Sequence, residues 1–256
     1  MPAIAALLSR TETVQAVRRA LPRGSWYLVR CRSAAALERA AATRVVDAVV
    51  FAPTDTSLGE LGSFRRAFPR IPRIALAPFR PDHGSLLLEC REEEVATVLV
   101  EGVENAVAGE VILRLSAAAE RGRALADGPR MLRLTDPIQR RVWVHLLERV
   151  DLPVRTATLA RQVGLSREHL SREFGAGGAP NLKRVIDLTR VACAAALLQN
   201  PGYDSGTVAR VLGFASASHL SATARRIASV SAGGLAALGP RGVLAAFARG
   251  NTRSRL

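Results

Sequence analysis

Ten polar side chains in the C-terminal part of the chain have the chemistry needed to bind a nucleic acid. Guanidinium and hydroxyl groups can hydrogen-bond to phosphate oxygens and base edges, and a carboxylate can accept from cytosine. The side chains form two clusters: Ser166, Arg167, Glu168, Ser171 and Arg172, and then Ser216, Ser218, Ser221, Arg225 and Arg226. In the first cluster, Arg167, Glu168, Ser171 and Arg172 are predicted to face outward on a helix whose apolar side carries Leu170 and Phe174.

A short sequence pattern occurs twice around these clusters. Leu-Ala-Arg at 159–161 and Val-Ala-Arg at 208–210 are each followed by a glycine and then by His-Leu-Ser, with one extra residue in the second copy. Gly164 and Gly213 allow a turn with positive φ, and the alanines allow two helices to approach closely. Each copy therefore predicts a helix-turn-helix whose second helix is opened by a serine. A single helical hairpin is weak evidence of DNA binding, but two copies on a basic segment are stronger.

The segment from about Pro153 to Leu238 resembles the DNA-binding domain of AraC/XylS-type transcription regulators. The resemblance implies two recognition helices that bind duplex DNA, a bacterial regulator of transcription, and no catalytic residues. It covers about a third of the chain. The residues that carry it are Leu159, Ala160, Ser166, Leu170, Arg172, Phe174, Pro180, Arg190, Ala194, Leu197, Leu198, Val208, Ala209, Gly213, Phe214, Ser218 and Leu220.

The second copy departs from the family pattern at several positions. Ala222 stands where an arginine is usual, Ala224 where a phenylalanine is usual, and Ser229 and Ala232 where glycine and proline are usual. We therefore expect the second unit to pack more loosely and to contact DNA mainly through phosphates. The resemblance implies that the second cluster, Ser216, Ser218, Ser221, Arg225 and Arg226, faces DNA. Serines discriminate bases poorly, so this half is expected to read sequence loosely.

The side chains of the first cluster have different expected roles. Arg167, at the start of the recognition helix, is the strongest candidate for reading a base, because guanidinium can bond guanine bidentately. Arg172 either contacts DNA or pairs with a helix C-terminus, and Glu168 either accepts from cytosine or caps its own helix. Ser166 is predicted to cap that helix. His169 and His219 are interpreted as packing positions, so no metal site is predicted.

A helix predicted over residues 181–199 joins the two units. Its length of about 28 Å, at 1.5 Å per residue, is close to the roughly 34 Å between successive major-groove entries on one face of DNA. A rigid helix of this length could hold two recognition helices in adjacent grooves. Arg190 resembles a residue that ties this helix to its neighbours.

Charge is concentrated in the C-terminal half. The chain of 256 residues has a formal net charge of +14, with 17 basic and 14 acidic residues in 1–123 against 19 and 8 in 124–256. This asymmetry favours an anionic partner, most simply double-stranded DNA. Lys183 is the only lysine, and nearly all other basic residues are arginines. The base composition of the genome therefore explains the positive charge as well as selection for binding does.

Cysteine usage and hydropathy bear on the compartment. Cys31, Cys90 and Cys193 are scattered without metal-ligand spacing, which is typical of reduced thiols in a cytoplasm. No apolar run approaches the roughly 18 residues of a membrane span, and the first ten residues lack a charged signal-peptide start. We expect a cytoplasmic protein with no membrane partner and no cofactor.

The N-terminal half alternates strand and helix patterns. Strands are predicted at 3–8, 26–31, 47–51, 73–77 and 96–100, and helices at 13–21, 34–42, 58–68, 85–93 and 103–121. Five such units predict a parallel sheet covered on both faces. The fold class is therefore α/β plus all-α, and the order resembles the flavodoxin-like fold of response-regulator receiver domains.

The residues expected for receiver chemistry are missing. The resemblance implies acidic residues after the first strand, a phosphoacceptor Asp after the third, a hydroxyl after the fourth and a lysine after the fifth. The chain has Ser9 and Arg10, then Ala52, Pro78 and Glu101 at these places. Asp55 is interpreted as a cap or turn residue. We expect a pseudo-receiver without phosphorylation or a Mg²⁺ site.

The predicted organisation is a receiver-like domain at 1–123, a linker at 124–136, the double helix-turn-helix domain at 137–240 and a basic tail at 241–256. In the tail, a short amphipathic helix is predicted at 243–248, and the rest is expected to be disordered or to follow DNA phosphates. The N-terminal domain is expected to form a homodimer or to sense a signal, and RNA polymerase is a further candidate partner. An alternative is a protein-binding adaptor that has lost specific DNA reading through its second unit. An enzyme is disfavoured because the α/β half has no phosphate loop, nucleophile elbow or metal cluster.

Overall fold

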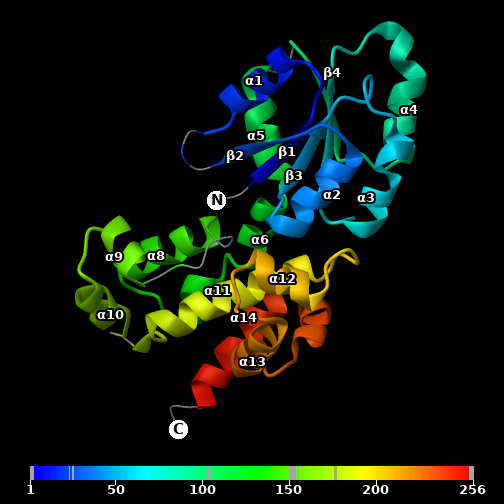
Figure 1. The fold of residues 1–256 in the computed structure, drawn as a ribbon. Helices are drawn as coiled ribbons and strands as arrows, with labels where there is room; N and C mark the ends of the chain where they lie inside the picture. The colour runs from blue at the N-terminus through cyan, green and yellow to red at the C-terminus, as the bar shows by residue number, and fades with distance from the viewer. Residues whose placement is uncertain are drawn as a thin grey trace. The chain divides into compact units, whose positions relative to one another are not determined.

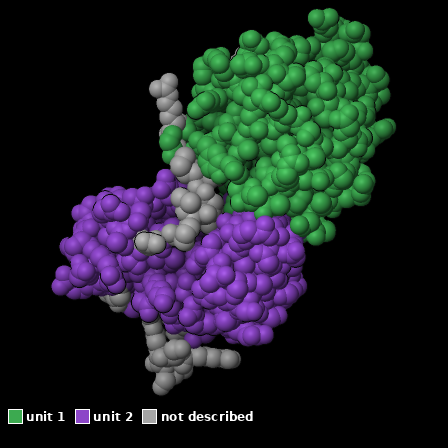
Figure 2. Space-filling view, viewed as in Figure 1, with its two compact units in different colours: residues 1–120, 200–202 green, residues 121–199, 203–256 purple. Residues whose placement is uncertain are grey.

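The computed structural model describes residues 3–22, 24, 26–102, 105–149, 154, 156–175 and 178–253. The chain divides into two compact units, which Figure 2 shows in two colours. Unit 1 contains residues 1–120 with 200–202, and unit 2 contains residues 121–199 with 203–256.

Unit 1 is built on a five-stranded parallel sheet. Its strands are β1 (Ala3–Leu7), β2 (Tyr27–Cys31), β3 (Ala48–Phe51), β4 (Arg73–Ala77) and β5 (Thr97–Val100). Their order is β2-β1-β3-β4-β5, and every neighbouring pair is parallel. This is the flavodoxin-like order, so the predicted fold of the N-terminal half is confirmed.

Helices cover both faces of this sheet. The helical elements after the strands are α1 (Thr11–Ala20), α2 (Ala34–Thr43), η1 (Leu58–Leu61), α3 (Gly62–Ala67), η2 (Pro81–His83), α4 (Gly84–Glu92) and α5 (Asn105–Leu115), and α6 (Ala117–Ala124) follows α5. α1 and α5 pack together on one face, where Ile4 and Ala6 meet Val17 and Ile112, whereas α2 and α3 lie on the other face (Figure 1). Every residue of β1, β3 and β4 is buried, as expected for central strands of a parallel sheet.

The helix predicted over 103–121 is instead broken at Ser116. This buried serine donates from Oγ to Leu113 O at 2.6 Å and accepts from Ala119 N at 3.2 Å. It therefore ends α5 and caps α6, which apolar periodicity alone does not reveal. Residues 103–104 lie outside the described residues.

Unit 2 is helical throughout its described residues. Its elements are α7 (Gly128–Met131), α8 (Pro137–Glu148), α9 (Thr156–Gln162), α10 (Arg167–Gly175), α11 (Leu182–Leu197), α12 (Ser205–Val211), α13 (Ala217–Ala228), η4 (Ala232–Gly234) and α14 (Leu235–Arg253). α11 is the central element: it contacts α8, α10, α12, α13 and α14, and Figure 1 shows it between the two helix-turn-helix units. The predicted all-helical C-terminal part is confirmed.

Two segments are more ordered than the sequence predicts. Within the expected linker, Leu132 and Leu134 are buried, and a Cβ on Gly128 would lie 2.1 Å from the Trp143 ring. In the tail, the helix predicted at 243–248 is confirmed, because α14 continues past a kink at Gly239 and buries Val243 and Phe247. The disorder expected for the rest of the tail is wrong up to residue 253, where α14 ends. Residues 254–256 lie outside the described residues.

Within the described part of the chain, no single helix has the length and apolar character of a membrane span. One bent pair, Ala217–Ala228 with Ala232–Gly250 at 62°, does meet those two criteria when its members are taken together.

A buried carboxylate fixes the start of the sheet. Asp47 is fully buried directly before β3, and its Oδ2 accepts from the backbone N–H of Ala3 at 3.0 Å. The backbone carbonyl of Asp47 accepts from Ala117 N at 2.8 Å, which attaches the start of α6 to the residue before β3.

We expect Asp47→Ala to lower the free energy of unfolding by about 1–3 kcal/mol, because a buried N–H loses its acceptor. Asp47→Asn keeps an acceptor oxygen and is the matched control, with a smaller expected loss. Urea denaturation followed by circular dichroism measures both variants. An Asn variant at least as destabilised as the Ala variant would contradict this role for the side-chain oxygen.

Candidate nucleic-acid interface

The first helix-turn-helix is formed by α9 and α10. α9 ends in a turn at Gly164, whose φ is +74° and around which a Cβ would meet no atom within 4 Å. Glycine is therefore needed for backbone conformation and not for space. After the turn, Leu165 N donates to Ala160 O at 2.9 Å, and Ser166 Oγ caps α10 by accepting from His169 N at 3.1 Å.

The second helix-turn-helix, α12 and α13, repeats this construction. Gly213 has a φ of +67°, and Phe214 N donates to Ala209 O at 2.7 Å. Ser216 Oγ caps α13 by accepting from His219 N at 3.1 Å. Leu220, like Leu170 in the first unit, is fully buried. The same bonds close both turns although one turn is a residue longer, so the predicted pair of helix-turn-helix units is confirmed.

The repeat extends to the helix that precedes each unit. In α8, Arg141 Nη2 donates to Val163 O at 2.9 Å, and in α11, Arg190 Nη2 donates to Leu212 O at 2.9 Å. Both bonds span 22 residues, and the two arginines are 49 residues apart, the same offset as the two glycines. Each guanidinium thus holds the carbonyl end of the helix before the turn.

Arg190 makes more contacts than Arg141. Its guanidinium lies 3.9 Å from the centroid of the Phe214 ring, a cation–π geometry. Burial lowers the pKa of Arg190, and the nearby Asp187 carboxylate opposes that shift. The structural role expected for Arg190 agrees with these contacts.

The first cluster lies on the exposed side of α10. Arg167, Glu168, Ser171 and Arg172 are exposed, whereas Leu170 and Phe174 on the opposite side are fully buried. Ser166 is exposed and caps the helix as predicted. The helix therefore presents two arginines, a carboxylate and a hydroxyl to solvent along one face.

The second cluster is less uniform. Ser216, Ser218, Arg225 and Arg226 are exposed, but Ser221 is half-buried and its Oγ accepts from Ala232 N at 3.4 Å. Arg226 Nη2 lies 2.7 Å from Asp187 Oδ2 of α11, and the Arg226 side chain keeps 55% of its surface exposed. Ser221 and Arg226 thus have structural partners that sequence reasoning missed.

The second unit is not packed loosely, contrary to the expectation from Ala222 and Ala224. Ala224 is fully buried, Ile227 is nearly so, and α13 contacts α11, α12 and α14. The second unit is therefore a well-packed part of the helical domain.

The two histidines occupy packing and surface positions. His169 Nε2 lies 3.3 Å from Glu173 Oε1 one turn later, and the His219 ring meets the Phe214 ring edge-on with centroids 5.7 Å apart. Across the described residues, no three His, Cys, Asp or Glu side chains gather in a metal-binding group.

One family model matches the segment that contains both helix-turn-helix units. Residues 159–236 match the family described as "Helix-turn-helix domain". They form an AraC-type helix-turn-helix domain. Among solved structures, full-length FixJ from B. japonicum aligns over 88% of this chain and 96% of its own, with 15% identity and a TM-score of 0.37. No curated protein matches the chain.

The equivalent hydrogen bonds of Arg141 and Arg190 can be compared by mutation. We expect Arg190→Met to cost about 2–3 kcal/mol of unfolding free energy, because a charge-assisted hydrogen bond and a cation–π contact are lost together. Arg141→Met removes the equivalent bond from an exposed side chain and is expected to cost about 1 kcal/mol. Urea denaturation compares the two. An equal or larger loss in the Arg141 variant would contradict the added contribution of the Phe214 ring.

Proposed function

We propose that the chain is a sequence-specific transcription regulator that inserts α10 and α13 into the major groove of duplex DNA. The observation that carries this proposal is the pair of equivalent turns, each opening a serine-capped helix with an exposed polar face. A helix N-terminus presented in this way is the element with which helix-turn-helix proteins contact base edges.

The two recognition helices have different side chains and, in this proposal, different tasks. Arg167 and Arg172 on α10 can each form a bidentate pair with guanine, so α10 supplies most of the sequence preference. Glu168 and Ser171 accompany them on the same face. α13 offers serines and arginines, which suit phosphate contacts that position the domain.

α11 is shorter than the joining helix predicted over residues 181–199. Sixteen residues give about 24 Å, shorter than the about 28 Å expected from the sequence and below the roughly 34 Å repeat of B-DNA. Both recognition helices contact α11, so the spacing between them does not depend on the length of α11 alone. Adjacent grooves of one DNA face are the proposed targets. The ion pair between Arg226 and Asp187 fixes α13 to α11.

Unit 1 is proposed to dimerise or to sense a signal in this cytoplasmic regulator, and the chain is proposed to have no enzyme activity. A homodimer would match repeated half-sites on DNA. RNA polymerase is the partner proposed for activation. A protein-binding adaptor remains the alternative, and selection of bound duplexes from random DNA separates the two, because an adaptor enriches no sequence.

For the selected duplex, we expect Arg167→Ala to cost about 1–3 kcal/mol and to reduce discrimination at one base position. Arg225→Ala should instead weaken binding to all duplexes alike and lower the magnitude of the salt slope by about 1. Fluorescence anisotropy across a salt series measures both effects. Equal losses from the two variants on every duplex would contradict the division between base reading and phosphate contact.

Arg226 needs a separate comparison because it has a partner within the domain. Asp187→Asn removes that partner while leaving the guanidinium in place. If Arg226 contacts phosphate, Arg226→Ala weakens DNA binding and Asp187→Asn does not. If Arg226 acts only by positioning α13, both variants weaken binding to a similar extent.

We expect no phosphoryl transfer to unit 1. Ala52 has no nucleophilic oxygen, and the Asp55 carboxylate already accepts from the Ser9 and Thr54 hydroxyls. Incubation with acetyl phosphate and Mg²⁺, followed by intact-mass measurement, is expected to show no added phosphoryl group. A phosphoryl adduct lost in Asp55→Asn would overturn this prediction.

A further inference from the structure

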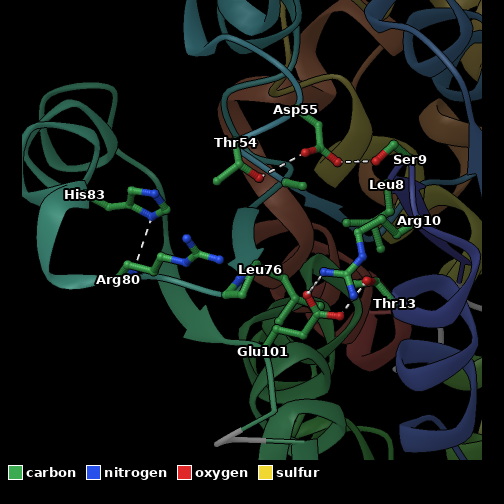
Figure 3. A pocket seen from close by; sticks show the side chains of 12 residues that line it. Leu8, Ser9, Arg10, Thr13, Thr54, Asp55, Leu76, Arg80, His83 and Glu101 are labelled. Carbon is green, nitrogen blue, oxygen red and sulfur yellow. Dashed lines mark hydrogen bonds and ion pairs between the residues drawn. The ribbon is translucent and has the colours of Figure 1, made fainter.

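A pocket opens at the carboxyl ends of the strands in unit 1. It has a volume of about 330 Å³ and is lined by residues that follow β1, β3, β4 and β5, among them Ser9, Arg10, Asp55, Arg80 and Glu101 (Figure 3). The carboxyl ends of strands are where open parallel sheets bind their ligands, and this volume lies in the range of small-molecule sites.

The charges in this pocket are the reverse of those expected for a receiver. Arg10 stands where an acidic residue is expected, and Glu101 stands where a lysine is expected. Arg10 Nη1 lies 3.1 Å from Glu101 Oε2, and Thr13 Oγ1 donates to Glu101 Oε1 at 2.6 Å. Both oxygens of this carboxylate therefore have donors.

The second carboxylate of the pocket is also occupied. Asp55 accepts from the Ser9 hydroxyl through one oxygen and from the Thr54 hydroxyl at 3.0 Å through the other. A divalent cation needs carboxylate oxygens that are available as ligands, and here hydroxyl and guanidinium donors cover them. The residues of this pocket do not fit the metal that the fold family implies.

Arg80 and His83 supply hydrogen-bond donors on the opposite side of the pocket. Arg80 is exposed, and its guanidinium extends from the segment after β4 toward Leu76 and the Arg10–Glu101 pair (Figure 3). His83 Nδ1 accepts from the backbone N–H of Arg80 at 3.3 Å. This bond leaves Nε2 as the ring's N–H donor.

Further arginines lie beside this pocket. A neighbouring hollow of about 350 Å³ shares Leu8, Ser9 and Asp55 with it and is also lined by Arg30 and Arg32. The strand ends thus combine two satisfied carboxylates with several guanidinium groups, an arrangement complementary to a negatively charged ligand.

We propose that the strand-end pocket binds a small organic anion, whose phosphate or carboxylate group is held by the Arg80 guanidinium and His83 Nε2–H. The Arg10–Glu101 pair and the Ser9–Asp55 bond form the opposite wall. This proposal deepens the sensing role proposed for unit 1. It is measured without DNA, so its failure and a failure of DNA binding are separate results.

The test is isothermal titration of the full-length protein with three probes: inorganic phosphate, glycerol phosphate and citrate, each against chloride at equal ionic strength. We expect saturable binding of one probe class, phosphate or carboxylate, which identifies the anionic group. Arg80→Gln should weaken that binding about 10-fold or more, since it removes a charge-assisted bidentate donor. Glu101→Gln should strengthen it about threefold, because a negative charge near the ligand is removed.

Two arginine variants serve as controls. Arg66→Gln, on α3 and outside the pocket, should bind the probe as the wild type does. Arg167→Gln reports binding of the probe to the helix-turn-helix domain. Loss of binding in Arg167→Gln with none in Arg80→Gln would overturn the proposal, as would no saturable binding of any probe up to about 10 mM. Opposite effects of Arg80→Gln and Glu101→Gln are the result that supports it.

Discussion

The DNA-binding domain depends on how two short helices are held at the turn between them. α9 and α12 have seven residues each, too few to be stable alone. Each is fixed by a backbone bond across its glycine turn and by an arginine from the preceding helix that donates to its last carbonyls. These bonds fix the turns and so help to set the direction of the exposed faces of α10 and α13.

The constraint in unit 1 is electrostatic. A flavodoxin-like sheet brings the residues after four of its strands to one edge, so their charges must be compatible with one another. Here an arginine faces a glutamate across that edge, and an aspartate is bonded to two hydroxyls. The same backbone that could hold an acidic metal site therefore holds a site to which Arg80 contributes an exposed guanidinium.

Much of this architecture could be predicted from the sequence. The strands are buried apolar runs with clear ends, and the two helix-turn-helix units share glycine and serine positions. The hydrophobic pattern and the turn residues therefore predict the same elements. The break at Ser116 could not be predicted, because it depends on hydrogen bonds of a serine inside an otherwise helical pattern. The helix after Gly239 could be predicted only in part, over residues 243–248, because its packing depends on tertiary partners. Arg141 could have been found, since it precedes Arg190 by the repeat offset of 49 residues, whereas the pairing of Arg226 with Asp187 has no sequence signal.

The two units share their turns but differ in how firmly the recognition helix is attached. α13 is connected to α11 by the Arg226–Asp187 ion pair, and its unit gains the Arg190–Phe214 contact and the cover of α14. α10 is tied to α8 through Gln139, whose amide donates to Glu173 O at 3.0 Å, and keeps both of its outward arginines exposed. Long unpaired arginines can adjust to base edges, whereas a helix held at several points is better suited to fixing register on phosphates. These differences between the two units support the proposal that α10 reads bases and that α13 positions the domain on phosphates.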